Sequence, residues 1–222
     1  MGEDSFGINP NVIKSFANQV KEVVNSGIQL CMVVGGGNIY RGRELTSLNI
    51  DQVSADYIGM LSTIMNGIAL SNFLSSNNCE NSLFSSFAIG NFVKAYSKEE
   101  AEKSLVEDKI VILVGGLGNP LFTTDSTASV RAVELNSDVM LKATNVDGVY
   151  SDDPKVNKEA IKYEHLSFDE AITKNLKVMD QTSLCFCRDN NLSVRVFNAD
   201  AEGAILEAII NENTDIGTLV EL

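Results

Sequence analysis

Three loops in the sequence combine glycines and polar residues in a pattern that suits phosphate binding. Gly35-Gly36-Gly37-Asn38 follows an apolar run, residues 115–120 (GGLGNP) follow the run KIVILV, and residues 143–148 (ATNVDG) follow VMLK. Because glycine has no Cβ, successive backbone N–H groups can close on an oxyanion, and the N-terminus of a following helix adds partial positive charge. One such loop could be a purely structural turn, but two in equivalent positions favour phosphate binding.

Polar residues beside the loops fit the same chemistry. Arg41 can offer a bidentate guanidinium to phosphate oxygens, and Asp56 can accept hydrogen bonds from ribose hydroxyls. Thr123, Thr124 and Asp125 supply hydroxyls for a phosphate and a carboxylate for a cation or a lysine. Each charged residue also has a structural interpretation. Arg41 could be an ion-paired loop residue, and Asp56 and Asp125 could be acids that suit helix N-termini. Neither glycine loop matches G-x-x-x-x-G-K-[ST] or G-x-G-x-x-G, so the P-loop and dinucleotide fingerprints are absent.

Other chemistries are disfavoured by the residue inventory. His165 is the only histidine and has no second imidazole or cysteine partner, which argues against catalytic triads and zinc sites. The cysteines have no metal-ligand spacing and are expected to be free thiols in a reducing compartment; they are Cys31, Cys79, Cys185 and Cys187. Carboxylates, lysine, arginine and backbone N–H groups are left to carry the chemistry.

Charge and hydropathy limit the partners. The 222 residues include 30 acidic and 17 basic side chains, and the net charge of −13 has the wrong sign for a nucleic-acid-binding protein. No apolar run approaches the roughly 18 residues needed to cross a bilayer. The N-terminus MGEDSFG has no basic or apolar region of a signal peptide. We therefore expect a cytoplasmic protein with no nucleic-acid or membrane partner.

Helices that alternate with short buried strands must position the loops. Strands are expected at residues 28–34, 82–89, 109–114, 139–143 and 194–197, with residues 217–222 closing an edge. Helices are expected to begin at Pro10, Val53, Ser97, Asp125, Ser167, Asp180 and Glu202. The expected core residues of the second helix are Ile58, Leu61, Ile64, Met65, Ile68 and Phe73. This alternation predicts one domain, residues 1–222, folded as a three-layer α/β/α sandwich with a mostly parallel central sheet.

Six segments, taken together in their order and spacing, resemble the bacterial uridylate kinases of the amino acid kinase family. They are VVGGGNIYRG, SADYIGMLSTIMNGIAL, VGGLGNPLFTTD, LKATNVDGVYSDDP, LKVMD and RVFN, and the resemblance extends from about Phe6 to the C-terminus. It implies an enzyme that transfers the γ-phosphoryl group of ATP to UMP, giving UDP and ADP in pyrimidine nucleotide biosynthesis. It further implies a homohexamer with GTP and UTP as effectors.

The resemblance also implies a role for individual residues. Gly36 and Asp56 would contact UMP, while Gly37 and Arg41 would face the transferring phosphates. The uridylate base and phosphate would be wrapped by Leu117, Gly118, Asn119, Pro120, Leu121, Phe122, Thr123 and Thr124. Thr144, Tyr150 and Asp153 would hold the ATP nucleoside. Asp125 would orient the catalytic cations, Lys177 would lie near the ATP phosphates, and Mg²⁺ would be held mainly by nucleotide and water, with no dedicated protein ligands.

The sequence departs from the family pattern at two places. Family members begin with an interior strand and a Lys-x-Ser-Gly-Glu type loop, whose lysine bridges the ATP phosphates, and the 222 residues do not include such a segment. We expect either that an internal methionine or a cut defines this start, or that the chain is a naturally shortened homologue with impaired activity. Leu117 and Leu121 replace a usual threonine and aromatic residue, which predicts looser substrate selection. The alternatives are a non-catalytic nucleotide- or oxyanion-binding homologue and a kinase of aspartate, glutamate or carbamate.

Overall fold

The structure is a computed structural model that describes residues 7, 10–40, 49–154, 156–199, 203–210 and 216–222. The chain divides into two compact units, Met1–Thr127 and Ala128–Leu222, and each is described by itself. The boundary falls within α5 (Thr124–Glu134). That residues 1–222 act as a single domain stays a prediction.

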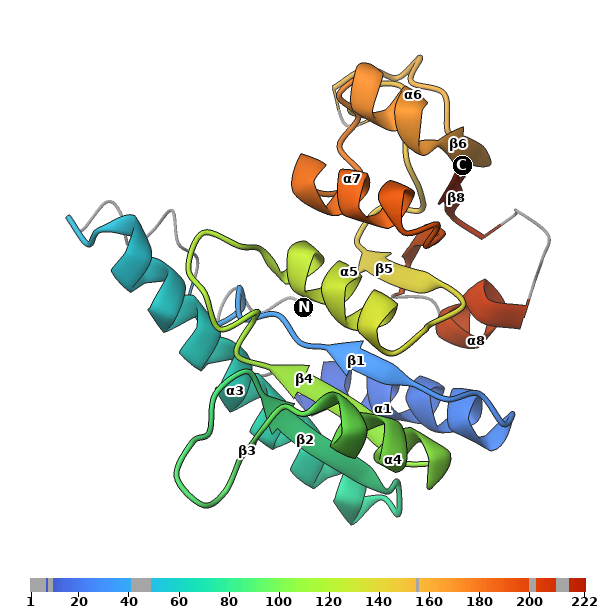
Figure 1. The fold of residues 1–222 in the computed structure, drawn as a ribbon. Helices are drawn as coiled ribbons and strands as arrows, with labels where there is room; N and C mark the ends of the chain where they lie inside the picture. The colour runs from blue at the N-terminus through green and yellow to red at the C-terminus, as the bar shows by residue number, and fades with distance from the viewer. Residues whose placement is uncertain (1–6, 8–9, 41–48, 155, 200–202, 211–215) are drawn as a thin grey trace. The chain divides into compact units, whose positions relative to one another are not determined.

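The first unit is built on a four-stranded parallel sheet in the order β1-β4-β2-β3 (Figure 1). Its strands are β1 (Cys31–Val33), β2 (Asn81–Ser85), β3 (Lys94–Ala95) and β4 (Ile110–Val114). In β4, Val111 pairs with Cys31 on one side and with Ser82 on the other. All residues of β4 are buried, as its continuous apolar run predicts for an interior parallel strand.

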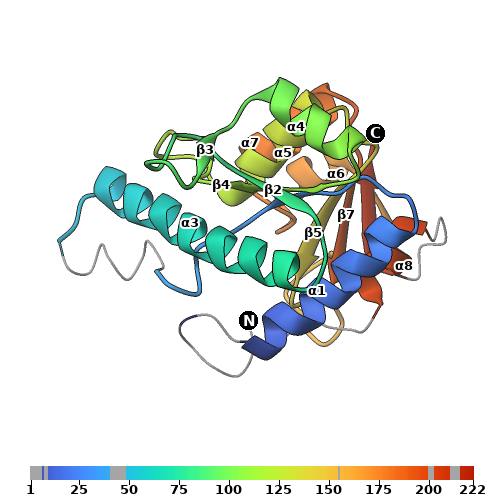
Figure 2. The ribbon, with the colours of Figure 1, turned by 90° about the horizontal axis from the view of Figure 1, so that it is seen from below.

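Helices cover both faces of this sheet. α1 (Pro10–Asn25) and α3 (Gln52–Ser76) lie side by side on one face, and α4 (Lys98–Val106) covers the other (Figure 2). The core beneath α1 and α3 contains Val20, Ile64 and Leu74 packed with the β4 residues Ile110 and Ile112. The helix starts are capped as the sequence predicts, since Ser97 accepts a hydrogen bond from the Glu100 N–H at 3.3 Å.

The exposed side of α3 corrects part of the sequence interpretation. Ile64 is buried, but Leu61 and Met65, which we predict as core residues, are 51% and 56% exposed. With Val53 and Tyr57 they form a stripe at four-residue spacing, the α3 stripe. The error arises because α3 is apolar on nearly all sides, so hydrophobic periodicity could not identify the face that meets the sheet.

α3 also meets the length and mean hydropathy of a membrane-spanning helix, although polar residues interrupt its apolar sequence throughout. The structure gives a simpler reason for its apolar character. Ile64, Leu70 and Leu74 are buried in the core of the first unit, where they pack with strand residues of the sheet. A core helix of a globular protein passes the same test of length and hydropathy.

The second unit contains another four-stranded sheet, in the order β5-β7-β8-β6. The strands are β5 (Met140–Thr144), β6 (His165–Ser167), β7 (Val194–Asn198) and β8 (Thr218–Glu221). β5 pairs with β7 and β6 with β8 in parallel, whereas β7 and β8 are antiparallel. β8 therefore lies inside the sheet, not at the predicted edge. The sequence did not predict β6, a three-residue strand that runs directly into α6.

The helices of the second unit complete its core. After the end of α5 come α6 (Phe168–Thr173), α7 (Gln181–Asp189) and α8 (Ala204–Ile210). Phe168 of α6 and Leu184 of α7 are fully buried together with Val194 and Val220 of the sheet. The N-caps Ser167 and Asp180 accept hydrogen bonds from the amides three residues ahead, at 3.1 and 2.8 Å. All four cysteines are free, as predicted.

Candidate active site

The first glycine loop leaves β1 and packs directly on α3. A Cβ at Gly36 would lie 2.8 Å from both the carbonyl oxygen of Gly59 and the Cβ of Ser62, so a side chain cannot be accommodated without movement. The N–H groups of Ile39 and Tyr40 both donate to the Gly36 carbonyl, at 3.0 and 3.1 Å. The loop is therefore a tight turn held against a helix.

The second glycine loop follows β4 and requires glycine for its backbone conformation. Gly115, Gly116 and Gly118 have φ angles of +76°, +58° and +81°, in the left-handed region that glycine adopts without strain. The Gly115 N–H donates to Thr63 Oγ1 at 2.7 Å, and the Ser86 hydroxyl donates to the Gly116 carbonyl. The Gly115 amide is therefore already satisfied by α3, which leaves other groups of the loop to meet a ligand.

Asp56 lies in the second turn of α3 and is half-buried. Its Oδ2 accepts a hydrogen bond from the Leu121 N–H at 2.8 Å, and its Oδ1 accepts one from Gln52 Nε2 at 2.7 Å. Leu121 has a φ of +72°, which is unusual for a residue with a Cβ. Asp56 thus links α3 to the chain that follows the second glycine loop, and a ligand hydroxyl would compete for the same carboxylate.

The start of α5 presents hydroxyl groups beside the second loop. Thr123 Oγ1 accepts a hydrogen bond from the Ser126 N–H at 3.1 Å and so caps the helix. Thr124 is exposed and Asp125, in the first turn, is half-buried. Because the N-terminus of a helix carries partial positive charge, this position favours an anionic ligand.

These pieces surround a cleft of about 300 Å³ within the first unit. Among the predicted site residues, its lining includes Gly36, Gly37, Asp56, Leu117, Asn119, Phe122, Thr123 and Thr124. Gly118, Pro120 and Leu121 belong to the same loop but are not part of the lining. Arg41, which we predict to bind phosphate, lies outside the described residues. The cleft therefore unites residues from three separate segments of the sequence.

Sequence reasoning missed several lining residues. The missed lining residues are Tyr40, Ala55, Gly59, Met60 and Thr63, whereas Gly116, which also lines the cleft, belongs to the predicted second glycine loop. The sequence carried no signal for Thr63, because its burial and its hydrogen bond to Gly115 depend on the fold. No signal marks Met60 either, which reads as an ordinary core residue.

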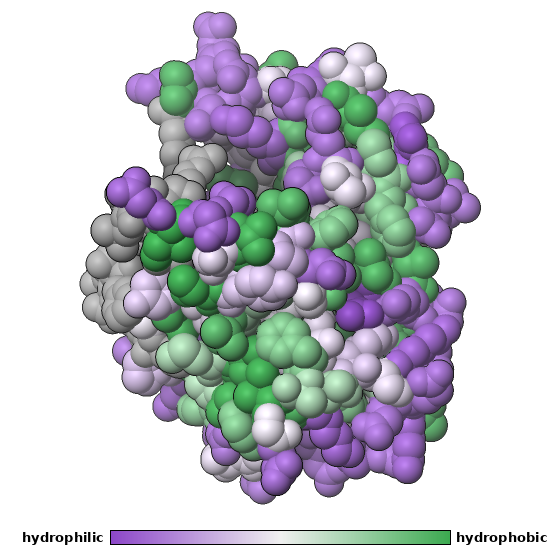
Figure 3. Space-filling view, turned by 60° about the vertical axis from the view of Figure 1, so that its left-hand side comes forward, coloured by the Kyte–Doolittle hydropathy of each residue, from purple (hydrophilic) through white to green (hydrophobic). Residues whose placement is uncertain are grey.

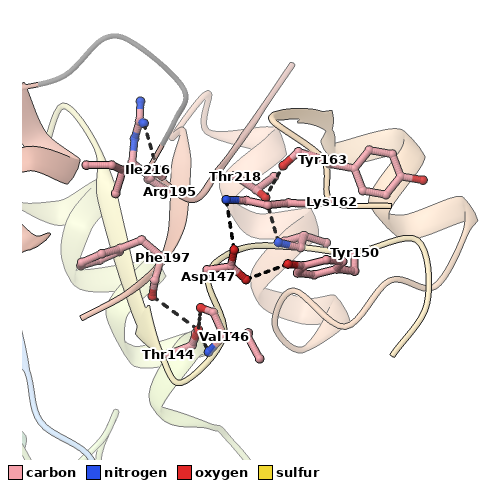
Figure 4. Close-up of polar contacts among 11 residues, drawn as sticks. Thr144, Val146, Asp147, Tyr150, Lys162, Tyr163, Arg195, Phe197, Ile216 and Thr218 are labelled. Atoms are coloured by element: carbon pink, nitrogen blue, oxygen red, sulfur yellow. Dashed lines mark hydrogen bonds and ion pairs between the residues drawn. The ribbon is translucent and has the colours of Figure 1, made fainter. Parts of the chain in front are cut away.

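In the second unit, the loop after β5 carries a polar network (Figure 4). The Tyr150 hydroxyl donates to Asp147 Oδ1 at 2.8 Å, and Lys162 Nζ lies 3.4 Å from Asp147 Oδ2. Thr144 Oγ1 accepts from the Val146 N–H at 3.1 Å and donates to the Val146 carbonyl at 2.7 Å. Two of the residues predicted to hold the ATP nucleoside, Thr144 and Tyr150, therefore belong to one ordered loop.

The charges and hydrogen bonds of this network shift the pKa values of Asp147 and Tyr150. Burial raises the pKa of Asp147, but the hydrogen bond from Tyr150 and the charge of Lys162 outweigh it, so the pKa lies below its ordinary value of 3.8. The hydrogen bond to Asp147, followed by burial, raises the pKa of the Tyr150 phenol. Tyr150 is thus held as a neutral hydrogen-bond donor at physiological pH, with its ring fixed by the bond to Asp147.

Asp153 and Lys177 are both exposed parts of the second unit. The Asp153 carbonyl accepts from the Val156 and Asn157 amides at 3.0 and 2.8 Å, which shapes the turn after Tyr150. A hydrogen bond from Asn157 is the main cause that lowers the pKa of Asp152, and the charge of Lys177 contributes. Among the described residues, no cluster of three or more His, Cys, Asp or Glu side chains could hold a metal ion.

Comparison with known proteins places this geometry in a family. The amino acid kinase family model matches residues 1–198. The chain is 44% identical to the uridylate kinase of Alcanivorax borkumensis over 220 residues, which is 99% of this chain and 86% of that protein. The chain belongs to the uridylate kinases of the amino acid kinase family. The uridylate kinase of Coxiella burnetii is also 44% identical, over 100% of this chain and 90% of that protein.

Solved structures agree with the family assignment. The UMP kinase from Bacillus anthracis has a TM-score of 0.95 at 37% identity and covers 99% of this chain and 90% of its own. The UMP kinase from Ureaplasma parvum has a TM-score of 0.94 at 38% identity, covering 100% and 94%. The predicted α/β class with mostly parallel strand pairing is confirmed. The expectation about residues upstream of Met1 and the individual site roles stay predictions.

Proposed function

We propose that this protein is a uridylate kinase that transfers the γ-phosphoryl group of ATP to UMP and releases UDP and ADP, within pyrimidine nucleotide biosynthesis. One observation carries the proposal. Gly36, Gly116 and Asp56 line a single cleft in a chain that is 44% identical to proteins named uridylate kinase. A cleft with glycine loops for a phosphate and one carboxylate that can accept hydrogen bonds from ribose hydroxyls suits a nucleoside monophosphate.

UMP binding follows from the chemistry of the lining. The backbone at Gly36 and Gly116 lets phosphate oxygens approach, and the capped N-terminus of α5 adds hydroxyls and partial positive charge. Asp56 exchanges its internal hydrogen-bond donors for ribose hydroxyls. Leu117, Asn119 and Phe122 enclose the remainder of the nucleotide. Gly118, Pro120 and Leu121 support this enclosure through the course of the loop.

The loop after β5 binds ATP in this proposal. Thr144, Tyr150 and Asp153 hold the nucleoside, and the bond from Tyr150 to Asp147 keeps the ring in place for contact with the base. Gly37 and Arg41 face the phosphates. Mg²⁺, when bound, would neutralise phosphate charge and would be held mainly by nucleotide and water.

Phosphoryl transfer asks little covalent chemistry of the protein. A phosphate oxygen of UMP forms the new bond to the γ-phosphorus as the bond to the bridging oxygen of ADP breaks, through a loose transition state. The UMP phosphate is ionised near neutral pH, so no strong general base is needed. Alignment and charge therefore dominate. Arg41 and Lys177 stabilise the transferring group, and Asp125 orients the cations.

The assembly and setting are also part of the proposal. The α3 stripe exposes Val53, Tyr57, Leu61 and Met65 by 42% to 56%, and α3 lies on the side of the first unit that comes forward in Figure 3. An apolar face of this kind suits burial between subunits, and we propose a homohexamer. GTP and UTP are the proposed effectors by resemblance to the family. Free thiols suit the cytoplasm.

The direct test is ADP formation from ATP in the presence of UMP, measured with the 222-residue chain and with any residues that its gene encodes ahead of Met1. We expect turnover with UMP and none with aspartate, glutamate or carbamate. Asp56→Ala should lower kcat/KM for UMP by about 10- to 100-fold, as loss of a hydrogen bond to a charged group predicts. Nucleotide binding without turnover in both forms of the chain would favour a non-catalytic homologue.

A further inference from the structure

Thr63 and Asn66 of α3 contact the two glycine loops from the same face of the helix. They are three residues apart, so they are neighbours on the helix surface. Thr63 is buried and Asn66 is half-buried. Neither belongs to the residues that family resemblance assigns to substrate, and each makes its loop contact with a hydrogen bond shorter than 3 Å.

Thr63 holds the second loop with a hydroxyl that both donates and accepts a hydrogen bond. Oγ1 donates to the Met60 carbonyl at 2.7 Å, within the helix, and accepts from the Gly115 N–H at 2.7 Å. The first bond fixes the direction of the hydroxyl hydrogen, so a lone pair faces the loop. The Gly115 backbone is closely packed, since a Cβ there would lie 2.6 Å from Ser85 Oγ, and its φ of +76° suits only a residue without a Cβ. The hydroxyl therefore sets where the second loop begins.

Asn66 holds the first loop through a pair of amides. Asn66 Nδ2 donates to the Gly35 carbonyl at 2.8 Å and to Asn38 Oδ1 at 2.6 Å. Asn38 Nδ2 donates back to Asn66 Oδ1 at 3.1 Å and also to the Gly7 carbonyl at 2.9 Å. Asn66 thus contacts both ends of the Gly35–Asn38 turn. A side chain without an NH₂ group could not make these two donations.

The helix that carries both residues is itself pressed against the sheet. A Cβ at Gly67 would lie 2.3 Å from Val114 Cγ1, so α3 and β4 approach as closely as a glycine permits. Val114 is also the residue from which the second loop departs. A rigid helix that is fixed against β4 and bonded to both loops determines the distance between the loops.

We propose that Thr63 and Asn66 are positioning residues that set the separation of the two glycine loops by bonding each loop to one face of α3. The kinetic consequence rests on the proposed uridylate kinase activity, since a displaced loop misaligns the bound nucleotide. Misplacement of about 1 Å can lower a rate by about 100-fold. The structural consequence, local loosening of the loops, does not depend on that activity.

The test uses Asn66→Asp, which keeps the shape but replaces the donor with an acceptor, and Thr63→Val, which keeps the volume but removes the hydroxyl. Asn72→Asp is the matched control, because the Asn72 side chain lies on the same helix and donates within it, to the Ile68 carbonyl at 2.9 Å. Thr63→Ser keeps the hydroxyl, so it should retain the loop protection and the activity that Thr63→Val loses. Hydrogen exchange without nucleotide is followed in peptides covering residues 35–38 and 115–118.

We expect exchange to accelerate by about 2- to 10-fold for each hydrogen bond lost, in the first loop for Asn66→Asp, which removes two, and in the second for Thr63→Val. We also expect kcat/KM for UMP to fall by up to about 100-fold, with Asn72→Asp within about twofold of wild type. Unchanged exchange in both loops, or equal effects of Asn72→Asp, would overturn the proposal. If the wild type does not phosphorylate UMP, the proposed function fails while the exchange data still decide the positioning role.

Discussion

At Gly36 the first glycine loop touches α3 so closely that an added methyl group would meet the Gly59 carbonyl and Ser62 Cβ at 2.8 Å. We predict that Gly36→Ala lowers the free energy of unfolding by about 1–3 kcal/mol, as for other overpacked sites, and raises KM for UMP. Gly37→Ala is the stability control, because its Cβ position meets no other described residue within 4 Å apart from its chain neighbours. Urea unfolding of both variants measures the difference, and equal stabilities would contradict the packing argument.

Asp147 provides a pH-dependent prediction at the same scale. Its pKa in the folded protein lies below 3.8, so the stability that it contributes is complete above that pH and is lost as the pH falls through the folded pKa. Because its side chain is 59% exposed, we expect only about 0.2–1 kcal/mol. Urea unfolding at pH 6 should find Asp147→Asn less stable than wild type by this amount. A difference that grows as the pH is lowered below 3.8 would have the wrong sign.

At the scale of elements, α3 and β4 are held together at Gly67, where a Cβ would lie 2.3 Å from Val114 Cγ1. Gly67→Ala should destabilise the protein by about 1–3 kcal/mol. Gly59→Ala is a control on the same helix, since its Cβ position is open and replacing helical glycine by alanine stabilises by about 0.5–1 kcal/mol. Thermal unfolding distinguishes them. Similar melting temperatures for the two variants would show that the close approach of α3 to β4 at Gly67 does not determine stability.

The helices and strands also show which parts of the fold and of the site the sequence could predict. The run IVILV and the glycines that follow it are local signals, so β4, the second loop and the lining residues Gly36 and Thr123 were predictable. Long-range contacts were not. Thr63 and Asn66 look like isolated polar residues in an apolar helix, and only the fold places them against Gly115 and Gly35. β6 was missed because it has only three residues, the last of which is the N-cap of α6, and so carries no strand periodicity.

At the scale of the whole molecule, assembly is the property that the α3 stripe addresses. Leu61 is 51% exposed at its centre, so Leu61→Glu should leave the protomer folded yet place a charge in the proposed subunit contact. We expect light scattering after gel filtration to report a smaller particle for this variant than for wild type. Val106→Glu, at a 76% exposed apolar position on α4, is the control. Equal masses for Leu61→Glu and wild type would show that the α3 stripe does not form a subunit contact.

The central claim is that the cleft between the two glycine loops and Asp56 receives the phosphate acceptor. A crystal structure of the protein with UMP and a non-hydrolysable ATP analogue tests it most directly. The account predicts the uridylate phosphate against the backbone at Gly36 and Gly116, and the ribose at the Asp56 carboxylate in place of the Leu121 amide. UMP bound at another position, with the hydrogen bond between Asp56 and Leu121 intact, would contradict it.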